Sequence, residues 1–270
     1  MKVRQRLGLV SASLLLFHAA PAQSFSIIYK FTKGEERRYK STVTTQSLFE
    51  SKKSRVVTVM TEIFETHRTD TVYEDGSADI TLIRDSVIVT ENKKRAKRES
   101  EESLVGIPIA YHISKSGALT IVRALERLTS DQKADLESIL KSLEKKKGLV
   151  PERNVQVGES WQFEVPITQR SSSLSWDGSV KMTFRFAGTE RCGGNDCAII
   201  RADGTSSLLL SGDDFSGTIS GTSRGTMAFS IQLGKDLDWF IETEAAGTIE
   251  TQRGTIKMKF ASGFKSELLQ

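Results

Sequence analysis

Apolar and polar residues alternate one by one along much of the chain. In residues 254–266, Ile256, Met258 and Phe260 fall on one face of an extended chain, and the lysines between them fall on the other. A period of two is typical of an antiparallel strand that is buried on one side only. The sequence therefore predicts a mainly β protein with roughly a dozen strands. The other runs are residues 24–31, 37–49, 54–66, 78–90, 180–186, 227–233 and 237–241, and an apparent hairpin over 107–125 whose turn is Lys115–Gly117.

One stretch follows a helical period instead. In residues 129–148 the apolar side chains recur at the spacing of one helix face, and they are Leu136, Ile139, Leu140 and Leu143. A Thr-x-x-Gln capping signal opens this stretch, and a lysine run followed by a glycine closes it. We expect one amphipathic helix here, connecting an N-terminal β-rich half, 23–128, to a C-terminal β-rich half, 149–270. The pattern leaves open whether the halves form one domain, and one sheet or two.

The first 22 residues have the character of a secretory signal peptide. Three cationic side chains precede an apolar run from Leu7 to Phe17, and the sequence Ala-Pro-Ala follows at residues 20–22. This order predicts cleavage before Gln23. No cysteine lies near that point. We therefore expect an exported protein, periplasmic or extracellular, that is not lipid-anchored through an N-terminal cysteine.

Charge and hydropathy argue against two classes of partner. The chain has 38 Lys and Arg against 34 Asp and Glu, and three of the basic residues lie in the expected signal peptide. The remaining chain is nearly neutral, without the basic surplus that nucleic-acid binding requires. The basic run in residues 93–98 is followed by acidic residues and is interpreted as a solvated loop. Outside the signal peptide no apolar run approaches the roughly 18 residues of a membrane helix, so no transmembrane segment is expected.

Cys192 and Cys197 are the only cysteines, and the turn-forming sequence Gly-Gly-Asn-Asp separates them. In an exported protein this spacing favours a disulfide that closes a hairpin turn. A zinc site would also need His67 and His112, which lie on separate predicted strands. A redox pair would need Cys-x-x-Cys at the start of a helix. We expect a Cys192–Cys197 disulfide and no metal site.

The sequence shows no clear catalytic arrangement. His67 and His112 have no recognisable nucleophile beside them, and no Gly-x-Ser-x-Gly motif is present. The acidic pairs Asp213/Asp214 and Asp236/Asp238 fit turns, although the spacing of a glycosidase pair is set only in three dimensions. No Gly-Lys-Ser/Thr sequence opens a helix, as a phosphate-binding loop would require. We expect no catalytic residue and no cofactor.

The apolar strand faces of the second half form the candidate ligand-binding site. Glycines inside strands mark bends or close packing, and the Gly-Thr pairs after residue 200 are therefore typical of a strongly curved sheet. An incompletely closed sheet would leave its apolar face as a trough under the helix, and methionine and phenylalanine suit apolar ligands of varied shape. The alternative is the core of a packed sandwich. The candidate residues are Met182, Phe184, Phe186, Met227, Phe229, Trp239, Met258 and Phe260.

Three short motifs resemble a broad class of secreted bacterial β-rich proteins of unknown function. They are the opening IIYKFTKGEERRYKS, the segment Val155–Trp161, and Gly-Thr-rich strands near the end such as GTMAFSIQLG. In layout the chain also resembles the LolA/LppX group of lipoprotein and lipid carriers. The second resemblance implies a curved antiparallel sheet forming a half-barrel or open barrel, with helix covering the hollow and a lipid-like ligand inside.

These observations predict a non-enzymatic exported protein that binds an apolar or amphiphilic ligand, or an envelope protein, on a curved β-sheet. The alternative is a structural or interaction module of the cell envelope with a fully packed β core. A hydrolase acting on envelope carbohydrate is the third hypothesis. An open apolar hollow would favour binding, a packed sandwich would favour the structural module, and carboxylates or histidines converging in a cleft would favour an enzyme.

Overall fold

The computed structural model describes residues 23–50, 54–96, 104–123, 129, 149–170, 175–212, 214–252 and 254–269. The expected signal peptide, residues 1–22, lies outside the described residues, as does the predicted helix over 129–148 apart from Thr129. The described residues contain fourteen strands and no helix. The strands are β1 (Ser24–Phe25), β2 (Glu36–Glu50), β3 (Arg55–Val72), β4 (Ala78–Glu91), β5 (Lys94–Ala96), β6 (Pro108–Ile113), β7 (Leu119–Arg123), β8 (Val155–Gln156), β9 (Ser160–Arg170), β10 (Ser175–Cys192), β11 (Asn195–Gly212), β12 (Phe215–Ser230), β13 (Lys235–Thr251) and β14 (Gly254–Leu269).

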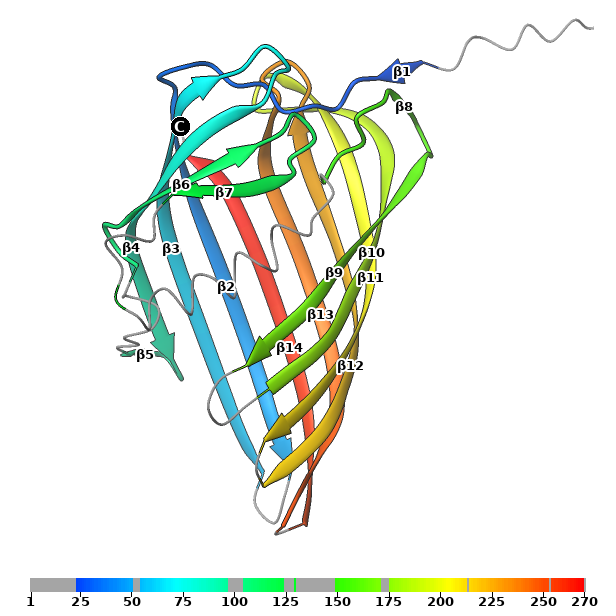
Figure 1. Ribbon diagram of the computed structural model, residues 1–270. Helices are drawn as coiled ribbons and strands as arrows, with labels where there is room; N and C mark the ends of the chain where they lie inside the picture. The colour runs from blue at the N-terminus through cyan, green and yellow to red at the C-terminus, as the bar shows by residue number, and fades with distance from the viewer. Residues whose placement is uncertain are drawn as a thin grey trace, which may run out of the picture.

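Twelve of these strands form one antiparallel sheet, which confirms a mainly β fold. Its order is β7-β6-β4-β3-β2-β14-β13-β12-β11-β10-β9, with β5 paired to β4, and β1 pairs separately with β8. Because β14 pairs with β2 from Lys257 to Leu269, strands of both halves belong to the same sheet. The sheet stays open, with β7 and β9 as its edges. Figure 1 shows that the strands form a strongly curved sheet, which is wide near β1 and β8 and narrows toward the other end.

The two faces of the sheet differ in the way that the alternating pattern predicts. Along β11 to β14, inward side chains are buried or half-buried and the side chains between them are exposed. The inner face carries most of the apolar residues, and the outer face carries lysines, glutamates and threonines. The strands are longer than the short runs that the sequence predicted: β10, β11 and β13 have 18, 18 and 17 residues. These strands continue through stretches that contain serine, threonine and glycine in place of the alternating apolar residues.

Glycines on the inner face explain how such long strands curve tightly. Gly217, Gly225 and Gly247 pair across neighbouring strands with Ile249, Ile241 and Ile219 respectively. A Cβ at any of these glycines would meet the backbone of the opposite strand. Each glycine therefore makes room for a larger partner on the crowded concave side, while the threonine that follows it points outward. The prediction that the Gly-Thr pairs mark close packing in a curved sheet agrees with this arrangement.

Two connecting segments, residues 24–31 and 149–155, pack against the inner face of the sheet at its wide end. Residues 24–31 were predicted to form a strand, but only Ser24–Phe25 does, and the extended residues after it bury Ile27 and Tyr29 among inner-face side chains. The Tyr29 ring packs edge-on against Phe229 at 5.2 Å. Val150 and Val155 join the same cluster from the other segment. The first segment alternates like a strand because it covers one end of the sheet with one face buried.

The predicted hairpin over 107–125 is present as β6 and β7. Its turn contains Gly117, whose φ of 83° is in the region that favours glycine. The amide of Gly117 donates to the carbonyl of Ser114 at 2.9 Å. A Cβ at Gly117 would lie 2.7 Å from the ring of Tyr29. The turn therefore requires glycine both for its backbone conformation and for its close approach to the covering segment.

Candidate functional site

The inner face of the sheet encloses an apolar hollow of about 550 Å³. Strands β9 to β14 form its wall, and Gly117 and Leu119 of the β6–β7 hairpin approach it from the opposite edge of the sheet. We call this space the apolar hollow. Its described lining is Gly117, Leu119, Leu149, Phe163, Val180, Met182, Phe184, Ser206, Leu208, Ile219, Ser223, Trp239, Ile241, Thr243, Ala245, Met258 and Phe260.

The structure separates the eight candidate ligand-binding residues into two groups. Met182, Phe184, Trp239, Met258 and Phe260 line the apolar hollow. In contrast, Phe186, Met227 and Phe229 are buried in the cluster at the wide end and are absent from the described lining. Phe186 and Phe229 are completely buried, because Phe25 and Tyr29 pack on them. The second group therefore belongs to the packed core.

The polar groups that reach the hollow do little to change its apolar character. The hydroxyls of Ser223 and Thr243 lie 2.8 Å apart and pair with each other. Ile241 and Phe260 remain only half-buried although both point inward. Pockets of this size with a few polar groups are typical of sites for small apolar molecules.

A second, wider depression of about 800 Å³ lies mainly on the outer face of the sheet. Leu48 and Lys259 are paired there, and exposed Glu244 and Thr222 also line it. This depression is larger than the apolar hollow, but it is shallow and bordered by charged side chains. Since ligand sites are usually enclosed, the smaller inner hollow is the better candidate.

A polar cavity of about 270 Å³ lies beside the apolar hollow. Gly117, Leu119, Leu149 and Trp239 line both spaces. We call this second space the polar cavity. Its other described lining residues are Tyr29, Phe31, Arg37, Tyr39, Ser41, Glu65, His67, Thr69, Ile80, Tyr111, Ile113, Asp236, Phe264 and Ser266.

Ion pairs hold most of the charged side chains around the polar cavity. Arg37 is buried and contacts Glu35 at 2.7 Å, and Glu35 also pairs with Lys235. Glu65 pairs with Arg84 at 3.2 Å. Burial tends to raise the pKa of the Glu65 carboxyl, but the close approach of His67 and the charge of Arg84 more than offset this effect and lower the pKa. Both carboxylates are therefore held in the ionised form.

Asp236 differs from these carboxylates because no described side chain forms an ion pair with it. It is half-buried and lines the polar cavity. Burial raises the pKa of this carboxyl, while its own backbone amide and the charges of His67 and Arg37 act in the opposite direction. Burial also raises the pKa of Tyr39 and of Tyr111 well above the ordinary value. The cavity thus places a carboxyl group among neutral phenols.

His67 and His112, interpreted from the sequence as ordinary strand residues, have different surroundings. His112 Nδ1 lies 2.9 Å from Asp79 near the surface. His67 lines the polar cavity, with Nδ1 3.1 Å from the hydroxyl of Tyr111 and Nε2 3.7 Å from Glu65. Among the described residues, His67 Nε2 and Trp239 Nε1 are the buried side-chain nitrogens or oxygens that have no hydrogen-bond partner. Both residues line the polar cavity.

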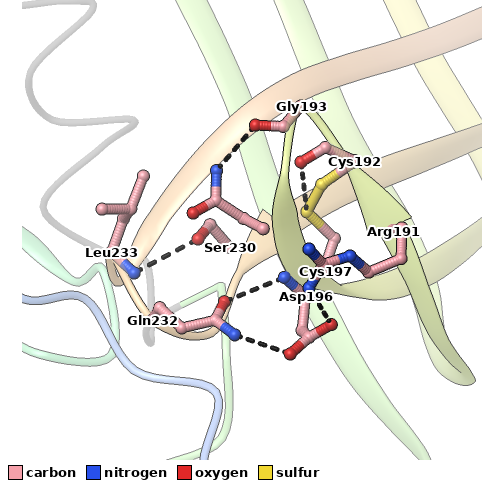
Figure 2. The surroundings of a disulfide bond; sticks show 9 residues. Arg191, Cys192, Gly193, Asp196, Cys197, Ser230, Gln232 and Leu233 are labelled. Carbon is pink, nitrogen blue, oxygen red and sulfur yellow. Dashed lines mark hydrogen bonds and ion pairs between the residues drawn. A yellow bond between two sulfur atoms is a disulfide. The ribbon is translucent and has the colours of Figure 1, made fainter.

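Cys192 and Cys197 form a disulfide, as predicted, and neither cysteine is free. The bond closes the β10–β11 hairpin, with the two Cα atoms 6.0 Å apart. Figure 2 shows that Asp196 in this hairpin exchanges two hydrogen bonds with Gln232 in the β12–β13 turn, at 3.0 and 2.8 Å. The zinc alternative is wrong, because both sulfur atoms are in the disulfide. Such a bond is typical of an extracytoplasmic protein.

The acidic pairs do not converge as a glycosidase would require. Asp214 lies in the β11–β12 turn, where the side-chain amide of Gln252 donates to it at 2.6 Å, and Asp213 lies outside the described residues. Asp236 points inward while Asp238 is exposed. In the basic run, Lys93, Lys94 and Arg95 are exposed as expected, but Lys94–Ala96 form strand β5 against β4 and not a loop, because their backbone pairs with Val89–Glu91; residues 97–98 lie outside the described residues.

Sequence reasoning missed the polar cavity, although the chain contained a signal for it. Glu65 and His67 are in phase with Ile63 on β3, and Arg37 and Tyr39 are in phase with Val43 on β2. Polar residues at positions where alternation predicts the buried face indicate an interior polar site. For Asp236 no such signal existed, because a register shift beside Phe229 sets its direction.

Comparison with known proteins identifies no family. No family model matches the chain, and no curated protein matches it. The similar solved structures include a mutant of the Rh. blastica porin, with 8% identity, 86% of this chain and 100% of that chain covered, and a TM-score of 0.27. They also include a putative exported protein with a YmcC-like fold from Bacteroides fragilis, with 9% identity, coverage of 90% and 97%, and a TM-score of 0.25. Similarities this distant transfer no site or activity to the chain.

These comparisons do not show the LolA/LppX resemblance that the layout suggested. In the part of the chain that the structure describes, no helix could span a membrane. Nor do three or more His, Cys, Asp or Glu side chains gather there in a way that could hold a metal ion.

Proposed function

We propose that this protein is a non-enzymatic exported protein that binds an apolar or amphiphilic molecule in the apolar hollow. The observation that carries this proposal is a space of about 550 Å³ whose described lining is mostly apolar side chains from one face of a curved sheet. Half-buried inward residues such as Ile241 and Phe260 would be covered by a bound ligand. Covering apolar surface of this kind favours binding by about 25 cal/mol per Å².

The two other hypotheses account for less of the structure. A structural module with a fully packed core fits the wide end, where Phe186 and Phe229 are completely buried, but it leaves the hollow without a role. A carbohydrate hydrolase would need paired carboxylates facing one space. Glu65 and Asp236 both line the polar cavity, but the ion pair with Arg84 occupies Glu65. A carrier of the LolA/LppX kind is the more specific form of the proposal.

The test is binding of a fluorescent hydrocarbon dye, diphenylhexatriene, to the purified protein. Ser206 points into the hollow from β11 and is half-buried, so Ser206→Trp would fill part of the space. The adjacent Ser207 is exposed on the outer face, so Ser207→Trp is a matched control with the same added bulk. We expect saturable binding that Ser206→Trp weakens about tenfold or more, which corresponds to about 1.4 kcal/mol.

The control variant should bind the dye like the unmodified protein. Circular dichroism of both variants would establish that the sheet is intact. No saturable dye binding, or equal weakening by the two substitutions, would reject the proposal and favour the structural module.

A further inference from the structure

We infer that the polar cavity is the head-group site of the apolar hollow, and that it takes an uncharged head bearing hydroxyl or ester oxygens, such as that of a monoacylglycerol. The acyl chain would then lie in the apolar hollow. This inference rests on the proposed function and adds to it the chemical class and the orientation of the ligand.

The adjacency of the two spaces supports the orientation. Trp239 and Leu149 line both the apolar hollow and the polar cavity, and the inference places one elongated molecule across both. Their chemical character changes across this boundary. Aliphatic, phenyl and thioether groups dominate one side, whereas the other adds phenol, imidazole, hydroxyl, guanidinium and carboxyl groups to apolar side chains such as Phe31, Ile80 and Phe264. An amphiphile matches this change only with its head in the polar cavity.

The balance of charge supports an uncharged head. Among the described residues, the charged groups that line the polar cavity are Arg37, Glu65 and Asp236. Their ion-pair networks add Glu35, Lys235 and Arg84. Three cations thus face three carboxylates. An ionic head would introduce an enclosed charge without a counter-charge, which is strongly unfavourable.

The hydrogen-bonding groups favour a head that contains oxygen. Trp239 lines both spaces, and its Nε1, which can only donate, has no hydrogen-bond partner. When the Tyr111 hydroxyl donates to His67 Nδ1, the imidazole carries its proton on Nε2, which has no hydrogen-bond partner and lies 3.7 Å from Glu65. The inference assigns an oxygen of the head group to these two donors as their acceptor. Asp236 can accept from a ligand hydroxyl.

The experiment measures displacement of diphenylhexatriene by three amphiphiles with the same dodecyl chain length. These are dodecanoyl monoglyceride, dodecyl sulfate and dodecyltrimethylammonium, each below its critical micelle concentration and at about pH 8, far above the ordinary pKa of an aspartate. We expect the monoglyceride to bind about tenfold more tightly than either ion. Equal displacement by all three would overturn the inference while leaving the proposed function intact.

Two variants shift the charge balance in opposite directions. Asp236→Asn gives this set of charges one excess positive charge and should raise the affinity for dodecyl sulfate about tenfold relative to the monoglyceride. Lys235→Gln gives the set one excess negative charge and should raise the affinity for dodecyltrimethylammonium by a similar factor. Asp203→Asn, on the exposed outer face, is the matched control and should change neither preference.

The outcomes separate the two proposals. Opposite changes of preference in the two variants would support the inference, and if one variant does not fold the other still tests it. Unchanged preferences in the variants that fold would overturn the inference. Absence of dye binding by the unmodified protein would overturn the proposed function, and the inference with it.

Discussion

Replacing Gly221 with alanine tests whether crowding on the concave face explains the glycines of the long strands. Gly221 lies on β12 and pairs with Ala245 on β13. An added Cβ would be 2.5 Å from the carbonyl oxygen of Glu244 and 2.6 Å from the Cβ of Ala245. Ordinary contacts begin near 3.4 Å, so the strands would have to separate by nearly an ångström.

The magnitude follows from the rigidity of the neighbours. Both clashing atoms belong to or lie next to the backbone of a paired strand, so a side-chain rotation cannot relieve the clash. Overpacking of this kind costs about 1–3 kcal/mol. Gly263 on β14 offers a matched control, because a Cβ there would meet nothing within 4 Å. Gly263→Ala should instead stabilise the protein by about 0.4–1 kcal/mol by restricting the unfolded chain.

Urea unfolding followed by tryptophan fluorescence would measure both effects. The two variants should differ by about 1.4–4 kcal/mol in free energy of unfolding, with similar dependence on urea concentration. If Gly221→Ala were as stable as Gly263→Ala, close strand packing would not be the reason for glycine at this position, and the explanation of the curvature would be wrong.

Three further predictions concern the core, the disulfide and Asp236. Phe229→Ala should cost about 3–5 kcal/mol because Phe229 is completely buried, whereas Phe260→Ala in the hollow should cost less and weaken dye binding, as urea unfolding and dye titration would show. Replacing both Cys192 and Cys197 with serine should cost about 2 kcal/mol in urea unfolding, because the closed loop is short, and should leave dye binding unchanged. Since burial raises the pKa of Asp236 in the folded state, its contribution to stability is lost as pH rises through that pKa. Asp236→Asn should therefore melt at a higher temperature than the unmodified protein near neutral pH, and the difference should vanish below about pH 3.9; a constant difference across this range would contradict the assignment.

The sequence predicted the faces of the strands better than their extent. Alternation identified Met258 and Phe260 as inward residues, because the strand period fixes which face a side chain occupies. The sequence underestimated the lengths of the strands. On the inner face of β12, for example, glycines stand at positions where an alternating strand pattern would have an apolar residue. These positions depend on the cross-strand partner, and pairing between distant strands is not visible in local sequence.

The candidate site was predicted in part for the same reason. Trp239 and Phe184 line the hollow as expected, but Phe229 has the same pattern and lies in the packed core. The difference comes from Tyr29, which reaches Phe229 from a segment far away in the chain. Alternation gives the face of a residue, and only the tertiary structure shows which part of that face another segment covers.

The features that destabilise the fold are concentrated where the ligand is proposed to bind. Packing is complete around Phe186 and Phe229, so the chain can build a dense core from the same residue types. Beside that core, Ile241 and Phe260 stay half-buried. Asp236 lines the polar cavity without an ion-pair partner among the described side chains. Two buried side-chain nitrogens, His67 Nε2 and Trp239 Nε1, have no hydrogen-bond partner among the described residues. A purely structural module would gain stability by filling the hollow and replacing Asp236. Natural proteins retain such unfavourable groups mainly where they serve binding, because a ligand that covers the apolar wall and pairs the polar groups offsets their cost.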